Sequence, residues 1–227
     1  MNNSSKTNWL DELQQLYPDA ACELVHVNPY ELLIAVILSA QTTDKAVNLV
    51  TPALFRSYPT PFDLATANLS DVETILQSIG LYRNKAKNII ETARQLVQEY
   101  DGDVPASRSK LMKLPGVGRK TANVVLSVAF HIPAVPVDTH VERIAKRLGL
   151  AKQNDDVLQV EAKLKRKIPR ELWNVSHHQM IHFGRYFCTA KSPQCEMCQL
   201  TNECNYFKKN VANAAKKSNN KKQNGLV

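Results

Sequence analysis

The chain has 227 residues, of which 44% are hydrophobic, so it holds enough apolar material for one large or two small folded domains. Its formal net charge of +8 favours a polyanionic partner, with nucleic acid as the leading choice. The polar start MNNSSKTNWL has no signal core, and the longest apolar run, LLIAVILSA, is far too short to span a membrane, so we expect a cytoplasmic protein without membrane contacts.

Helical periodicity runs through almost the whole chain. Apolar residues recur at intervals of three and four in the segments 8–17, 29–41, 44–55, 70–80, 84–100, 139–150 and 155–168. The apolar run inside 29–41 indicates a buried helix, and Ser70 with Glu73 is typical of a capping box. Because convincing alternating strand patterns are absent, we predict an all-α protein of about ten helices.

The segment LPGVG, residues 114–118, lies between two helical segments and predicts a tight helical hairpin. Gly116 and Gly118 can both adopt a positive φ and expose their backbone amides, with Val117 between them. The second helix begins directly after the turn, so its unpaired N–H groups add to an anion site that suits a DNA phosphate. A purely structural turn is the alternative, and the pattern alone leaves both open.

Arg119 and Lys120 follow the turn and lie in the first turn of that second helix. The helix dipole and the adjacent cation both oppose a further positive charge, which favours a neutral, nucleophilic amine on Lys120. Lysines contact phosphates far more often than they form covalent bonds with substrates. A simple phosphate contact therefore remains the alternative role.

A break between two helical lobes is predicted in residues 131–140, because two prolines there end the preceding helix. The next helix is expected to begin at a capping Thr139, with Glu142 completing a capping box. Asp138 precedes that cap, and its carboxylate either supports the cap or stabilises a developing cationic sugar and moves a proton. His140 is expected to have a supporting role at most.

Four cysteines lie close together near the C-terminus in the spacing C-x6-C-x2-C-x5-C: Cys188, Cys195, Cys198 and Cys204. Disulfides are not expected in a cytoplasmic chain, so four thiols in one short segment indicate a metal site. Structural zinc usually takes two close cysteine pairs, whereas this segment has one close pair and two outlying cysteines, which favours a [4Fe–4S] cluster over zinc. Cys22 stands alone and is expected to be a buried core thiol.

The loop TAKSPQ between the first two of these cysteines carries Lys191, and Arg185 precedes it. A loop that is held rigidly by a metal can present such cations to a phosphate backbone. An ordinary solvated loop is the alternative.

Taken together, these motifs closely resemble bacterial endonuclease III, a family of helix-hairpin-helix DNA glycosylases. The motifs are LPGVGRKTANVV, VPVDTH and the four-cysteine segment, with PYELLIAVILSAQTTD and SIGLYRNKAKNI upstream of them. The resemblance implies two α-helical lobes around a DNA-binding cleft. One is a six-helix barrel of residues 22–132, and the other joins residues 1–21 to residues 133–207 and carries a [4Fe–4S] cluster. It also implies a monomeric enzyme that removes oxidised pyrimidines from double-stranded DNA and then nicks the strand.

The resemblance also assigns roles to single residues. Lys120 matches the nucleophile of the family and Asp138 its essential aspartate, while the hairpin glycines match its phosphate-binding turn and the four cysteines its cluster ligands. Gln41 and Leu81 match residues that fill the gap left by a flipped nucleotide. Met112 departs from the pattern, because some relatives have a carboxylate there, near the catalytic lysine.

The implied mechanism begins with extrusion of the damaged base, because the C1′ atom of its sugar cannot be reached inside the stack. The neutral amine of Lys120 then displaces the base, and the resulting Schiff base permits β-elimination. Three other functions remain open: a monofunctional glycosylase that uses water, a non-catalytic hairpin DNA-binding protein, and a redox protein that uses the cluster.

The last segment, residues 208–227, differs in composition from the rest of the chain. It contains six lysines and no acidic residue, which leaves a net charge of +2 on the remainder. We predict that it is disordered and adds a salt-sensitive affinity for phosphates that does not depend on sequence.

Overall fold

The computed structural model describes residues 9–211, and all of their regular secondary structure is helical, which confirms the predicted all-α class. The helices separate into two compact units. We call residues 22–136 the hairpin unit, and residues 9–21 together with 137–211 the cysteine unit. Of the predicted tail, residues 208–211 belong to a π-helical turn, η5 (Phe207–Val211), and the remainder lies outside the described residues. No helix of the described part is long and apolar enough to cross a membrane.

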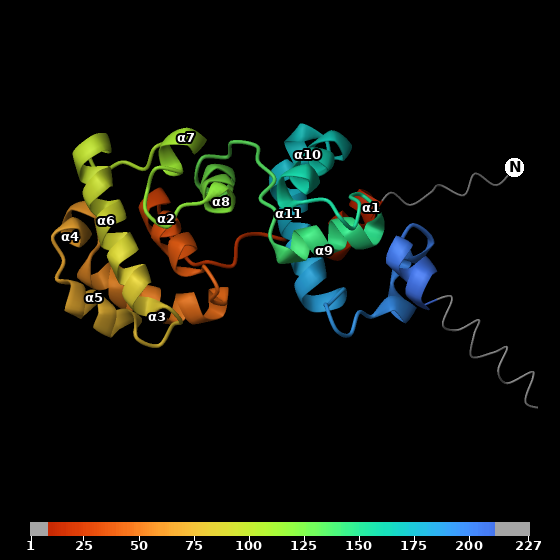
Figure 1. The fold of residues 1–227 in the computed structure, drawn as a ribbon, viewed down its shortest axis with the longest axis horizontal. Helices are drawn as coiled ribbons and strands as arrows, with labels where there is room; N and C mark the ends of the chain where they lie inside the picture. The colour runs from red at the N-terminus through yellow and green to blue at the C-terminus, as the bar shows by residue number, and fades with distance from the viewer. Residues whose placement is uncertain (1–8, 212–227) are drawn as a thin grey trace, which may run out of the picture. The chain divides into compact units, whose positions relative to one another are not determined.

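The hairpin unit is built around one buried helix. Its helices are α2 (Pro29–Leu38), α3 (Asp44–Ser57), α4 (Pro61–Ala65), α5 (Leu69–Leu76), α6 (Tyr82–Tyr100), α7 (Arg108–Leu111) and α8 (Arg119–Ala129). Every residue of α2 from Leu32 to Leu38 is buried, as the apolar run predicts, because this helix is apolar on all sides and α3, α6 and α8 pack against it (Figure 1). Asn28 fixes its start, since the side-chain oxygen accepts a hydrogen bond of 2.8 Å from the N–H of Glu31.

The start of α5 differs from the expectation. The predicted capping box of Ser70 and Glu73 is wrong, because α5 begins at Leu69 and Ser70 therefore lies inside its first turn. Asn68 is the cap, and its side-chain oxygen accepts a hydrogen bond of 3.1 Å from the N–H of Ser70.

The cysteine unit joins the two ends of the chain. It contains α1 (Trp9–Leu16), α9 (Thr139–Leu148), α10 (Val157–Lys167) and α11 (Trp173–His182), and α11 packs against both α1 and α9. The amide of Gln179 donates a hydrogen bond of 3.3 Å to the carbonyl oxygen of Tyr17. The rings of Tyr17 and His182 form a T-shaped pair with their centroids 5.8 Å apart. These contacts explain why a helix near the N-terminus belongs to a unit otherwise made from the C-terminal half.

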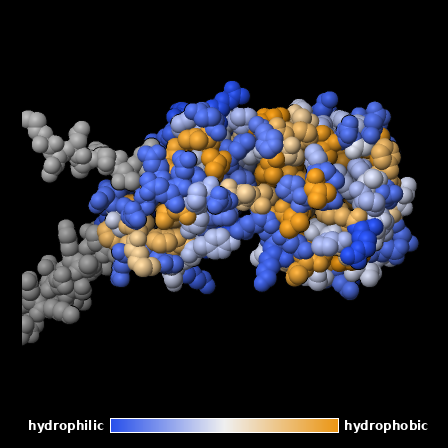
Figure 2. Space-filling view, turned by 180° about the vertical axis from the view of Figure 1, so that it is seen from behind, coloured by the Kyte–Doolittle hydropathy of each residue, from blue (hydrophilic) through white to orange (hydrophobic). Residues whose placement is uncertain are grey.

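The end of α9 allows a close approach of the chain that follows the last cysteine. Gly149 caps α9 with a φ of 78°, a left-handed conformation that favours glycine. A Cβ atom at Gly149 would lie only 2.2 Å from the side-chain nitrogen of Asn205. Glycine therefore lets the segment after Cys204 pack against the end of α9. On the face of the molecule that Figure 2 shows, many hydrophilic residues surround smaller groups of apolar residues.

Candidate nucleic-acid interface and metal centre

The predicted hairpin consists of α7, a short turn and α8. Gly116 has a φ of 76°, as expected, and a Cβ atom there would lie 3.1 Å from atoms of both Asn88 and Ile37. Val117 is buried and anchors the turn in the core. The expectation of a positive φ at Gly118 is wrong, because its φ is −87° and its backbone is extended. Gly118 is instead the N-cap residue of α8.

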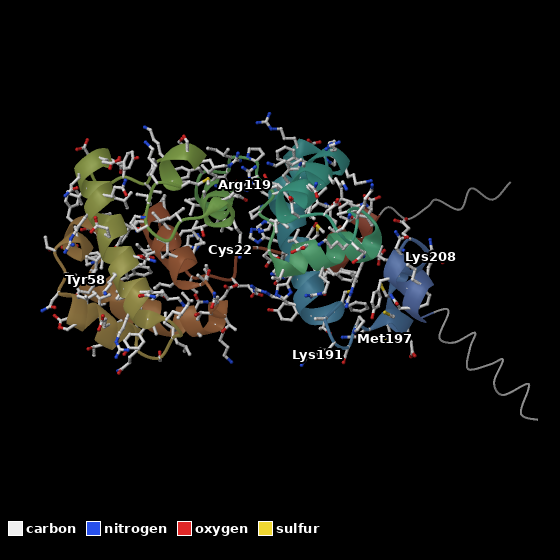
Figure 3. The ribbon with its side chains drawn as sticks, in the orientation of Figure 1. Cys22, Tyr58, Arg119, Lys191, Met197 and Lys208 are labelled. Carbon is white, nitrogen blue, oxygen red and sulfur yellow. The ribbon has the colours of Figure 1, made fainter. Side chains whose placement is uncertain are left out.

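The start of α8 is open to a ligand. No side chain caps this helix, since its N-cap residue is a glycine. Gly118, Arg119 and Lys120 are all exposed, and Figure 3 marks Arg119 on this helix. Uncapped backbone amides at a positive dipole end, with two cationic side chains beside them, form an arrangement that suits a phosphate group.

Buried hydrogen bonds hold the hairpin from behind. The hydroxyl of Thr92 donates to the carbonyl oxygen of Pro115 at 3.0 Å. The guanidinium of Arg108 in α7 donates to the side-chain oxygen of Asn123 in α8 at 2.8 Å. Because Thr92 and Asn123 are almost completely buried, these bonds are shielded from water and fix the turn relative to α6 and α8.

Asp138 begins the first long helix of the cysteine unit. The predicted cap at Thr139 is wrong, because Asp138 is the N-cap residue and Thr139 is the first residue of α9. One carboxylate oxygen, Oδ1, accepts a hydrogen bond of 2.8 Å from the N–H of Val141. Within the part of the chain that the structure describes, the other oxygen has no hydrogen bond. The half-buried carboxylate therefore combines a capping role with an oxygen that is available to a ligand.

His140 lies in the first turn of the same helix. Its Nδ1 atom is 3.2 Å from the guanidinium of Arg143, which in turn donates a hydrogen bond of 2.7 Å to the carbonyl oxygen of Gly184. Burial lowers the pKa of His140, and the charges of Arg143 and Arg185 lower it further, although Asp138 opposes them. These neighbours favour a neutral imidazole, and Arg185 is close enough to His140 to act on it.

Gln41 and Leu81 share an unusual backbone conformation. Their φ angles are 54° and 59°, in the left-handed region that residues with a side chain rarely adopt. Both side chains are exposed, and Leu81 shows 56% of its surface although it is apolar. Strained residues that project apolar or polar side chains into solvent are more typical of a binding surface than of a structural turn.

Lys85 was not singled out in the sequence, yet it connects these two positions. It is only 4% exposed, and its ammonium donates a hydrogen bond of 2.5 Å to the hydroxyl of Thr42, the neighbour of Gln41. Its backbone N–H donates to the carbonyl oxygen of Leu81 at 3.1 Å. A lysine on the buried side of an amphipathic helix is the sequence signal that could have identified it.

The four cysteines of the C-terminal segment line one largely apolar cavity, together with residues such as Ile144, Phe183 and Phe187. Burial raises the pKa of Cys195 and of Cys198, and the charges of the other thiols raise both further, so the sulfur atoms are electrostatic neighbours. Among the described residues, however, no three His, Cys, Asp or Glu side chains are grouped as ligands of one metal ion. The thiols thus surround a common space without converging on a single point.

Arg147 organises the first part of this segment. It is 8% exposed, and its guanidinium donates hydrogen bonds to the carbonyl oxygens of Cys188, Thr189 and Ala190 at 3.2, 2.7 and 3.0 Å. It also lies 3.1 Å from the sulfur of Cys188 and 4.4 Å from the centre of the Tyr206 ring. One buried cation therefore fixes a cysteine and the loop that follows it.

The loop after Cys188 carries Lys191 on its exposed side (Figure 3). The hydroxyl of Thr189 accepts a hydrogen bond of 3.2 Å from the N–H of Ser192, and the N–H of Gln194 donates to the carbonyl oxygen of Phe187 at 3.2 Å. These two hydrogen bonds close the loop, and Lys191 is exposed to solvent at its tip.

Two further residues from the sequence differ in their surroundings. Cys22 is half-buried and packs against the core of the hairpin unit, so it is less buried than predicted. Met112 follows α7 as its C-cap residue and is 45% exposed. An apolar side chain therefore occupies the surface of the hairpin at this position.

Comparison with known proteins gives consistent matches. The model of the HhH-GPD superfamily base excision DNA repair protein family matches residues 34–170. Endonuclease III of Bacillus subtilis (strain 168) is 54% identical over 86% of this chain and 89% of its own length. Two solved structures are similar, a trapped endonuclease III–DNA covalent intermediate with 57% identity and a non-covalent endonuclease III–DNA complex with 56%. Their TM-scores are 0.86 and 0.87, over 89% and 90% of this chain and 95% of each of theirs.

The burial of Lys85 leads to a prediction about pH. Burial lowers the pKa of Lys85 in the folded protein below its ordinary value of 10.5. Between the two pKa values the unfolded chain binds more protons, so the stability of the folded protein rises with pH in that window. We expect the free energy of unfolding of wild type, minus that of Lys85→Met, to increase as the pH approaches 10.5, as measured by urea unfolding at several alkaline pH values.

The matched control is Lys87→Met, which removes an exposed lysine from the same helix. Its difference from wild type should not change with pH, because water solvates that charge in both states. A difference between wild type and Lys85→Met that stays constant or shrinks as the pH rises would contradict the buried-lysine account.

Proposed function

The chain belongs to the endonuclease III family of HhH-GPD base excision DNA repair proteins, and from this premise we propose that it removes oxidised pyrimidines from double-stranded DNA and cleaves the resulting abasic site. The observation that carries the proposal is the exposed Lys120 beside an uncapped helix start. It is joined by a match of 57% identity to a protein trapped in a covalent intermediate with DNA.

We assign the first step to the hairpin. The open amides of α8 and the side chain of Arg119 bind a phosphate of the damaged strand, and this contact positions the strand without reading its sequence. Lys191 and Arg185 of the cysteine unit add positive charge for further phosphates. Val117 supports the turn from the core, and His140 supports the residues around Asp138.

Chemistry on a base requires that the nucleotide leave the stack, which leaves a gap in the duplex. Gln41 and Leu81 fill this gap in our proposal, because both are exposed and held in fixed, strained conformations. Because the backbone at both residues is already fixed, it loses little freedom when their side chains enter the duplex, so more of the binding free energy stabilises the extruded state.

The bond-breaking step belongs to Lys120. Its neutral amine attacks C1′ of the sugar, the bond from C1′ to the base breaks, and the base leaves with the electron pair and takes up a proton. The carboxylate of Asp138 stabilises the positive charge that develops on the sugar and accepts a proton from the attacking amine. The first product is an aminal, in which C1′ carries both the lysine nitrogen and the ring oxygen O4′. The bond from C1′ to O4′ then breaks and O4′ takes up a proton, which leaves an iminium. The iminium acidifies the C2′ hydrogen, so that loss of this proton breaks the C3′–O bond and expels the 3′ phosphate by β-elimination. Water then releases the lysine.

The nucleophile is tested by borohydride trapping on a duplex with an abasic site. Wild type should form a covalent adduct, whereas trapping by Lys120→Ala and by Lys120→Arg should fall by more than about 1,000-fold, because neither keeps a primary amine. Lys120→Arg should retain DNA affinity, since its guanidinium still binds phosphate. Lys113→Ala is the matched control, because Lys113 is an exposed lysine of the same hairpin, and it should trap like wild type.

A parallel assay on a duplex that carries an oxidised pyrimidine, read for base release, separates the rival functions together with the trapping experiment. A monofunctional glycosylase would release bases without giving an adduct in wild type. A non-catalytic DNA-binding protein, or a redox protein, would do neither. An adduct that persists in Lys120→Ala would mean that another amine is the nucleophile.

Two substitutions separate the capping role of Asp138 from its catalytic role. Asparagine is a good N-cap, so Asp138→Asn should keep the melting temperature of wild type, whereas Asp138→Ala should cost about 1 kcal/mol of stability. Both should lower the rate of base release by at least about 100-fold, because both lack the carboxylate. Thermal unfolding and a single-turnover excision assay measure the two effects. If Asp138→Asn excised bases at the wild-type rate, the residue would be a cap only.

We also propose that the four cysteines hold a [4Fe–4S] cluster. The four thiols line one apolar cavity, and their sequence spacing, with one close pair and two outlying cysteines, fits a cuboidal cluster better than a tetrahedral zinc site. When bound, such a cluster supplies four covalent cross-links within one short segment. Cys188, Cys195, Cys198 and Cys204 would be its ligands, and the cavity wall would exclude water from it.

The identity of the metal can be read from colour and composition. The purified protein should absorb broadly at the edge of the visible range and contain about four iron atoms per chain. Cys22→Ser should leave both unchanged, because Cys22 lies in the other unit, whereas Cys198→Ser should lose the absorption. A colourless wild-type protein with one zinc ion per chain would overturn the assignment.

We also propose that the hairpin unit and the cysteine unit are the two domains expected from the sequence. We propose that the protein acts as a monomer, since every residue in the mechanism comes from a single chain. We also propose a cytoplasmic location, because the proposed substrate is DNA and the endonuclease III of Bacillus subtilis is a bacterial protein.

A further inference from the structure

A cavity of about 780 Å³ lies in the cysteine unit, and none of its lining residues has a role in the proposed mechanism or the proposed metal site. The residues that line it belong to the end of α9, the loop that follows, α10, and the segment after Cys204. Gly149 shapes one wall, because it allows Asn205 to approach the end of α9. The volume falls in the range of small-molecule binding sites, which span about 300–1,000 Å³.

The described residues that line this cavity include five lysines and no acidic side chain: Lys146, Lys152, Lys163, Lys167 and Lys209. The other polar groups on the wall are neutral, and Gln153, Asn205 and Asn210 bring amides that can donate hydrogen bonds. Five cations from four separate stretches of chain therefore face one hollow.

Two of the five lysines are held in place by acids outside the cavity. The ammonium of Lys146 lies 2.6 Å from Glu142, and that of Lys163 lies 2.5 Å from Asp155. Lys152 and Lys167 are exposed and form no ion pair within the described ranges. Asp155 also accepts a hydrogen bond of 2.6 Å from the backbone N–H of Lys152, but two acids do not offset the positive charge that Lys152 and Lys167 add to that of Lys146 and Lys163.

Compensation of helix dipoles explains only part of this pattern. Lys146 and Lys167 lie in the last turns of α9 and α10, where a cation is favourable. Lys152 lies in a loop, and Lys163 lies in the middle of α10. The helix dipoles also do not explain why these lysines surround a cavity. Lysines that face one cavity repel one another, and an anion between them removes this repulsion.

We propose that this cavity is a second phosphate-binding site, for an anion that carries two or more phosphoryl groups. Lysine ammonium groups bind phosphate as point charges, and the wall amides add directional hydrogen bonds. The phosphoryl groups come either from the backbone of DNA or from a free polyphosphate. This inference goes beyond the proposed function, since neither base removal nor strand cleavage uses these lysines.

Lysine footprinting tests the proposal at single residues. The protein is acetylated with an N-hydroxysuccinimide ester, with and without tripolyphosphate at constant ionic strength, and the modified lysines are quantified by mass spectrometry. Acetylation of Lys152, Lys167 and Lys209 should slow by about fivefold when the site is four-fifths occupied. Lys87, an exposed lysine of the hairpin unit, should react at the same rate in both samples. Equal rates at the cavity lysines with and without tripolyphosphate would overturn the site.

Paired variants separate a built site from general positive charge. In Lys152→Gln/Lys167→Gln the protection of Lys209 should disappear. The matched control, Arg166→Gln/Lys208→Gln, removes the same charge from exposed residues of the unit that do not line the cavity, and it should keep that protection (Lys208 in Figure 3). Loss of protection in both double variants would show that net charge alone attracts the anion, and the proposal would fail.

The source of the phosphoryl groups is decided by a second arm with an undamaged DNA duplex. Protection of Lys152 and Lys167 by both ligands assigns the site to the DNA backbone, and protection by tripolyphosphate alone assigns it to a free polyphosphate. Because footprinting measures neither base release nor nicking, failure here is distinct from failure of the proposed repair activity.

Discussion

The architecture depends on a requirement of the helical backbone, namely that the first N–H groups of every helix need an acceptor. Six helices of the described chain meet it with the side chain of a cap residue: Asn28, Thr43, Thr60, Asn68, Asp138 and Asp156. Two long helices do not, since the N-cap residue of α8 is Gly118 and that of α6 is Leu81, and both N-cap residues are exposed. Two other helices also lack a side-chain cap, but α7 is a single turn and α11 continues from a preceding 3-10 turn. Of the two long helices without a side-chain cap, α8 carries the candidate nucleophile Lys120, and α6 directly follows the candidate DNA contact Leu81.

Backbone strain is a second observation that marks the surface around the start of α6 as a candidate DNA contact. A non-glycine residue in the left-handed region costs on the order of 1–2 kcal/mol, and it persists only where its surroundings enforce it. At Asp101 the conformation has an ordinary cause, because that residue ends α6. Leu81 has no such cause, since it stands at the start of a helix. The buried ammonium of Lys85 ties its turn to the neighbour of Gln41, so two strained positions are fixed by one costly, desolvated group.

The sequence predicts the helices well because their signal is periodic and local. The apolar run of α2, the hairpin turn and the four-cysteine segment are all readable without a structure. Cap positions are less certain, because a shift of one residue decides whether Thr139 or Asp138 accepts the first bond, and periodicity does not resolve a single residue. Lys85 and Arg147 were missed for a different reason. Their roles come from partners 43 and 41 residues away, and no local pattern encodes such contacts.

Arg147 shows why the type of cation matters in the cysteine unit. A lysine has one ammonium and cannot reach three successive carbonyl groups, whereas the planar guanidinium bonds to those of Cys188, Thr189 and Ala190 while it lies against Tyr206. The same group lies 3.1 Å from the sulfur of Cys188. One side chain thus positions a proposed metal ligand and the backbone of the loop that carries Lys191. The proposed metal site and the candidate phosphate contact are coupled through this guanidinium, so the hydrogen bonds of Arg147 hold the loop independently of any metal.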